Sequence, residues 1–84
     1  MNRDLFNNAN LKDVGIAAMS VIDRLQLHQP HVQMAAAAVV FLGLSEHWGI
    51  PAQDVFTAVK NMINDGEGKR PEYTAVREYI RHEL

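Results

Sequence analysis

The chain has 84 residues and no cysteine, so it carries neither a disulfide framework nor a zinc site built on thiolates. Eight Lys and Arg against ten Asp and Glu give a formal net charge of -2, without the basic excess typical of nucleic-acid-binding proteins. The length allows one small domain, which we divide into an N-terminal arm over residues 1–9 and a helical domain over residues 10–84. The first residues lack the apolar segment of a secretory signal, so we expect a soluble, cytoplasmic protein.

The arm is polar apart from Leu5 and Phe6, and its asparagines are typical of a loop. Asn10 is then placed to cap a helix that we expect to run to about Leu27, with Asp13 in the first turn. Apolar residues recur at helical spacing along this segment, at Leu11, Val14, Ala18, Val21, Ile22 and Leu25. The segment therefore predicts an amphipathic helix with a wide apolar face.

The run from Met34 to Leu44 contains no charged or strongly polar side chain. A helix that crosses a bilayer needs about 20 apolar residues, so this run is too short to do so. We predict a helix from about Pro30 to His47 that is central to the fold and covered by the other segments. A helix that is apolar on every side needs neighbours on every side, and so short a chain offers few. We therefore expect self-association, most simply as a two-fold homodimer.

Small side chains occur on both sides of the turn around Pro30. Ala17 and Ala18 precede it, and four alanines, Ala35 to Ala38, follow it. Because small facing residues let two backbones approach closely, the pattern predicts a tight antiparallel hairpin of the first two helices. The residues that we expect to mediate self-association are Ala37, Val40 and Phe41.

Two more helices complete the prediction. Gly49 is suited to end the second helix, Pro51 to begin a third that runs to about Asn64, and Pro71 to begin a fourth that runs to the end of the chain. Residues 64–70 are typical of a turn-rich loop, and we find no convincing strand. The fold class expected is all-α: a compact, four-helix bundle-like single domain with a central apolar helix.

The segment 44–59 resembles a helix-turn-helix. Four of its residues match that pattern: a small residue four places before the turn glycine, apolar residues on both sides of the glycine, and a β-branched residue six places after it. These are Ser45, Trp48, Ile50 and Val55. The resemblance implies a recognition helix, with Ala52, Gln53, Phe56, Thr57 and Lys60 facing the DNA groove. The principal contacts would be Gln53, Thr57 and Lys60. The alternative interpretation is an ordinary helical corner closed by glycine.

Exposed aromatic and basic residues are the candidates for binding another protein. Aromatic residues are enriched at interface hot spots, and the last helix has a basic side that is interleaved with acids. Glu78 and His82 have the spacing of an intrahelical pair. The residues that we expect to bind a partner are Trp48, Phe56, Tyr73, Arg77, Tyr79 and Arg81.

Catalytic and metal-binding patterns are weak. Ser45 and His47 lie two apart on a helix and point to opposite sides, so they cannot form a nucleophile–base pair. His28 and His31 lie at the opposite end of the predicted hairpin from His47, which separates them as metal ligands. We therefore expect no enzyme, no cofactor and no metal. The sequence favours a non-enzymatic protein–protein interaction module, an adaptor or inhibitor that also binds itself, without a membrane partner; the alternative is a helix-turn-helix DNA-binding regulator that uses residues 44–64.

Overall fold

The structure, a computed structural model, describes Leu5 and residues 8–65 and 68–84. Over these residues the chain forms four helices: α2 (Leu11–Leu25), α3 (Pro30–Trp48), α4 (Ala52–Ile63) and α5 (Pro71–Glu83). This confirms the predicted fold class, an all-α single compact domain. Most of the predicted arm, including Phe6, lies outside the described residues, whereas Leu5 is described and exposed.

The loop before α5 contains a short pairing that the sequence did not predict. Strands β1 (Asn64–Asp65) and β2 (Gly68–Lys69) run antiparallel, with Asn64 opposite Lys69 and Asp65 opposite Gly68. Each strand has two residues, so the pair closes a turn and adds no layer to the fold. Gly68 has a φ of 131°, which only glycine adopts readily.

Helix α2 begins as its sequence predicts. The side-chain oxygen of Asn10 accepts hydrogen bonds from the backbone N–H groups of Lys12 (3.0 Å) and Asp13 (3.2 Å). The helix ends at Leu25, earlier than expected, and Leu27 is 96% exposed in the turn that follows. The side-chain amide of Gln33 then donates to the carbonyl of Leu25 at 3.0 Å, which ties the start of α3 to the end of α2.

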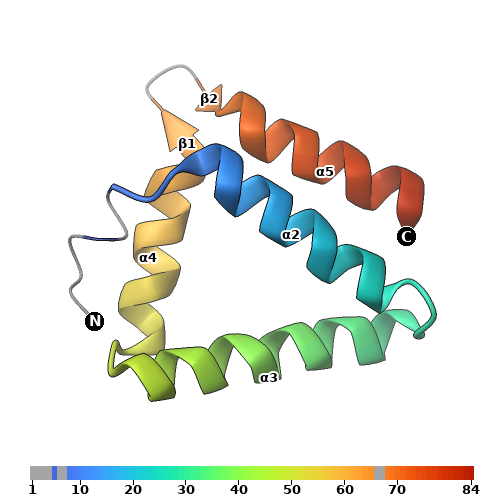
Figure 1. The fold of residues 1–84 in the computed structure, drawn as a ribbon, viewed down its shortest axis with the longest axis horizontal. Coiled ribbons are helices and arrows are strands. Elements are labelled where there is room, and N and C mark those ends of the chain that lie inside the picture. The colour runs from blue at the N-terminus through green and yellow to red at the C-terminus, as the bar shows by residue number, and fades with distance from the viewer. Residues whose placement is uncertain (1–4, 6–7, 66–67) are drawn as a thin grey trace.

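The helices are arranged as an open triangle. Figure 1 shows α2, α3 and α4 as its three sides, with α5 lying along the outside of α2 and running in the same direction. The most extensive helix–helix packing is between α2 and α5, and α2 and α3 touch little beyond the turn that joins them. The predicted α2–α3 hairpin is therefore wrong. The physical reason is that α5 covers the side of α2 that packs, so this side is not available to α3.

The buried core is thin. Among the described residues only Ile22, Ile50 and Val55 are buried large apolar side chains, and no large side chain is completely enclosed. In α3 the buried residue is Ser45, at its end. The expectation that the other segments cover Met34 to Leu44 is therefore wrong, whereas the expectation that this chain cannot shield so much apolar helix is confirmed.

The molecule is flat, with dimensions of 35 × 32 × 18 Å. None of the described helices is long and apolar enough to cross a membrane by itself. α3 and α4 reach that length and composition only when taken together, and they are bent by 110° at their connection.

Candidate functional site

The most prominent surface is α3 itself. Five of its exposed apolar side chains point to different sides of the helix, and we call these five the α3 surface; they are Met34, Val39, Val40, Leu42 and Leu44. Met34 is 77% exposed and Val39 is 69% exposed. Of the residues predicted to mediate self-association, Ala37 and Val40 are exposed and Phe41 is half-buried. The α3 surface can therefore bind only by burying apolar area, because it presents no charged group between Val32 and Leu44.

The corner between α3 and α4 buries three of the four residues that match the helix-turn-helix pattern. Gly49 adopts the left-handed conformation at φ 72°, and its N–H donates to the carbonyl of Glu46 at 3.2 Å. Ser45, Ile50 and Val55 are buried beneath the turn, and the Ser45 hydroxyl donates to the carbonyl of Ile50. The fourth matching residue departs from the pattern, since Trp48 is half exposed, with its ring edge-on to His47 at 4.8 Å between centroids.

Helix α4 presents the three predicted DNA contacts to solvent. Gln53, Thr57 and Lys60 are all exposed. The Thr57 hydroxyl donates to the Gln53 carbonyl at 3.0 Å, and the Lys60 ammonium lies 4.7 Å from the centroid of the Phe56 ring. Asp54 lies in the first turn of α4, and its negative charge offsets the positive charge that Lys60 gives to this helix. Of the other two positions that the resemblance assigned to the groove, Ala52 is half-buried and Phe56 is exposed.

Two polar contacts join α2 to α5. The Tyr79 hydroxyl donates to the carboxylate of Asp23, and the Gln26 amide donates to Glu83 at 2.7 Å. The hydrogen bond to Asp23, with smaller effects of burial and of the two carboxylates, raises the pKa of Tyr79 to about 12. Tyr79, a predicted partner contact, is therefore already engaged within the chain.

The remaining candidates belong to α5. Arg77 and Arg81 are exposed, and Tyr73 is half-buried with the Arg77 guanidinium 5.9 Å from its ring centroid. Glu78 has Arg81 at 3.8 Å and His82 at 3.7 Å, so the predicted spacing of Glu78 and His82 does bring them together. Because these pairs are exposed, they contribute little to stability, and the acid offsets part of the basic side.

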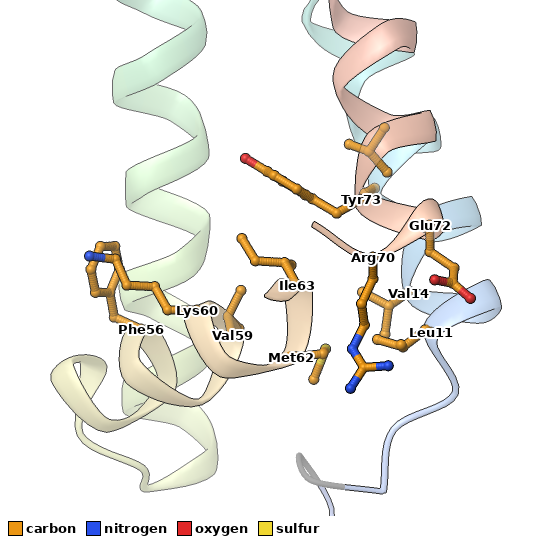
Figure 2. Close-up of a pocket in the computed structure, with 13 residues that line it drawn as sticks. Leu11, Val14, Phe56, Val59, Lys60, Met62, Ile63, Arg70, Glu72 and Tyr73 are labelled. Atoms are coloured by element: carbon orange, nitrogen blue, oxygen red, sulfur yellow. The ribbon is translucent and has the colours of Figure 1, made fainter. Parts of the chain in front are cut away.

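A pocket that the sequence did not predict lies between α2, α4 and α5. Its volume is about 450 Å³, within the range of small-molecule sites. Apolar side chains make up most of the lining, and they include Val14, Val59, Ile63 and Val76. Figure 2 shows the Arg70 side chain lying between Met62 of α4 and the α2 residues Leu11 and Val14. No periodicity along one segment could reveal this site, because each helix supplies only one wall.

The predicted partner contacts do not form a single patch. Trp48 and Phe56 are placed by α3 and α4, whereas Tyr73, Arg77, Tyr79 and Arg81 all belong to α5. Within the described parts of the chain, no group of three or more His, Cys, Asp or Glu could hold a metal ion. Ser45 donates its hydroxyl to a backbone carbonyl, which leaves it no base partner at His47.

Comparison with known proteins gives no relative. No family model, curated protein or solved structure matches the chain.

Proposed function

We propose that this chain is a non-enzymatic protein–protein interaction module that pairs with a second copy of itself through the α3 surface. The observation that carries the proposal is the exposed area of the single chain, 6490 Å². A folded monomer of 9.4 kDa is expected to expose about 5,000 Å². The chain thus exposes about 1,500 Å² more than its mass requires, while a standard interface takes about 800 Å² from each partner.

The chemistry of α3 favours a second copy as the partner. Between Pro30 and Trp48 there is no Lys or Arg, and the acid is Glu46 near the end. Two α3 helices can therefore meet without bringing like charges together along their middle. Ala35, Val39 and Gly43 follow at intervals of four and share one side of the helix. A Cβ added at Gly43 would meet nothing within 4 Å, so this side is open to close approach by another helix.

The experiment is sedimentation of Val39→Glu and Val40→Glu beside the wild type. Both side chains are exposed in the single chain, so a glutamate there does not disturb the fold, but it would place a charge inside the proposed interface. We expect a wild-type dimer and a folded monomer for at least one variant. Ala75→Glu, on the exposed side of α5, is the matched control and should remain dimeric. A wild-type monomer at the highest concentration reached would overturn the proposal.

Regulation through DNA binding is the second candidate, and the 110° angle between α3 and α4 favours it because helix-turn-helix units cross at about 90–120°. The exposed Gln53, Thr57 and Lys60 would then read the groove. Fluorescence anisotropy with a labelled duplex tests this function. A DNA-binding protein should bind nonspecific duplex at low salt and lose affinity steeply as salt rises. Lack of binding at low salt would exclude it.

A further inference from the structure

We infer that the pocket between α2, α4 and α5 binds a small amphipathic carboxylate, with its apolar tail inside and its anionic head on Arg70. The pocket holds about 450 Å³ and is walled mainly by aliphatic and aromatic side chains. An apolar tail would bury surface there that is now exposed, such as Val14, Phe56 and Val59. This inference is independent of the proposed self-association, because α3 contributes no residue to the lining.

We infer the chemistry of the head group from one atom, the Nε of Arg70. The Nε of Arg70 is buried and has no hydrogen-bond partner in the described structure. A buried N–H without an acceptor is costly, and an arginine pairs best with a carboxylate or phosphate oxygen. Nε is enclosed by protein atoms, so the Arg70 side chain must turn toward the pocket for an anion there to supply the missing acceptor. Among the described residues of the lining, the other charged groups are Lys60 and Glu72, so these residues supply two cations and one acid.

The position of Arg70 is fixed by its backbone. Its N–H donates to the carbonyl of Ile63 at 2.9 Å, and its own carbonyl accepts from the N–H of Thr74 at 3.0 Å. These bonds join the end of α4 to the start of α5, where Arg70 is the N-cap residue. In Figure 2 Lys60 lies beside Phe56, on the far side of the pocket from Arg70. We therefore place the carboxylate at Arg70 and let the tail run toward Val59 and Phe56.

A linear carboxylate, rather than a phosphate or a bulky anion, suits the site because the described residues offer one buried donor without a partner and little other polar surface. The proposal is tested with decanoate and, as an uncharged match of the same length, decan-1-ol. Methyl resonances in two-dimensional NMR report both affinity and place. Decanoate should shift the methyl signals of Val14, Val59 and Ile63, and Val39 on α3 should not move.

Arg70→Met removes the donor but keeps an apolar stem of similar length, so the fold should survive. We expect it to weaken decanoate binding about tenfold, the lower limit for a hydrogen bond to a charged group, and to leave decan-1-ol unchanged. Arg81→Met removes the same charge from an exposed position on the same helix and should have no effect. Ala18→Leu, which fills the pocket from α2, should abolish binding of both probes whether or not Arg70→Met folds.

Three outcomes would overturn the inference. The first is no binding of decanoate to the wild type. The second is equal binding of decanoate by wild type and Arg70→Met. The third is a shift of Val39 as large as that of the pocket methyls, because this would indicate adsorption on the α3 surface. None of these outcomes bears on self-association, which sedimentation measures separately.

Discussion

Two glycines show opposite requirements at the scale of single residues. Gly15 lies in the middle of α2, where glycine costs about 0.5–1 kcal/mol relative to alanine. A Cβ there would lie 3.9 Å from a methyl carbon of Val76 on α5, which is ordinary van der Waals contact. Gly49 instead has a φ of 72°, where an alanine is strained by about 1–2 kcal/mol.

We therefore predict that Gly15→Ala raises the free energy of unfolding by about 0.5–1 kcal/mol, while Gly49→Ala lowers it by about 1–2 kcal/mol. Urea denaturation of both variants at one protein concentration measures the two changes. If Gly15→Ala is destabilising instead, α2 and α5 pack more closely than the 3.9 Å contact implies.

At the scale of elements, the sequence predicted where the helices lie along the chain better than it predicted which helices pack together. Residues that cap, begin or end a helix act within a few positions of the chain. Asn10, Pro30 and Gly49 therefore define helix ends without information about tertiary packing. Which helices pack together, by contrast, depends on residues that are far apart in the sequence. The side of α2 that packs includes Gly15, which is buried although no search for apolar side chains selects it. Because α2 packs against α5, it does not cover α3.

The candidate sites follow the same division. The sequence predicted that α3 has more apolar area than a small chain can cover, but it also predicted, wrongly, that the other segments cover Met34 to Leu44. The helical corner at Gly49 could also be anticipated, since its signal lies within one segment. The pocket around Arg70 could not, because its walls come from three helices whose packing had been assigned differently. Hydrogen bonds between helices, such as that from Tyr79 to Asp23, could not be predicted for the same reason.

The hydrogen bond between α2 and α5 gives a prediction about alkaline pH. The pKa of Tyr79 is raised to about 12 in the folded chain, against about 10 when unfolded. The folded state therefore holds this proton more tightly, and its contribution to stability is complete below pH 10 and is lost as pH rises toward 12. Deprotonation would also place the phenolate beside the carboxylates of Asp23 and Glu83.

Tyr79→Phe removes the donor and should lower stability at neutral pH. The difference in unfolding free energy between wild type and Tyr79→Phe should shrink between pH 10 and 12, because the wild type then loses the same bond. Tyr73→Phe, on the same helix, is the control, and its difference from wild type should not follow this course. A difference for Tyr79→Phe that stays constant from pH 8 to 12 would show that the bond to Asp23 does not form.

At the scale of the whole molecule, the fold is flat and has a small core. The radius of gyration is 13.3 Å, and a compact chain of 84 residues is expected near 12 Å. Three buried apolar side chains among the described residues form a small core for a domain of this length. Small domains without disulfides or metals commonly reach stability by oligomerisation.

We accordingly predict that the melting temperature of the wild type rises with protein concentration, because a partner that binds only the folded chain stabilises it by mass action. Differential scanning calorimetry over a hundredfold range of concentration measures the shift. Val39→Glu should melt at a lower temperature that does not depend on concentration, since the Val39 side chain is exposed in one chain and would lie in the proposed interface. Ala75→Glu should follow the wild type. A wild-type melting temperature that is independent of concentration would mean that a single chain is stable with the α3 surface exposed to water, which would contradict the proposed self-association.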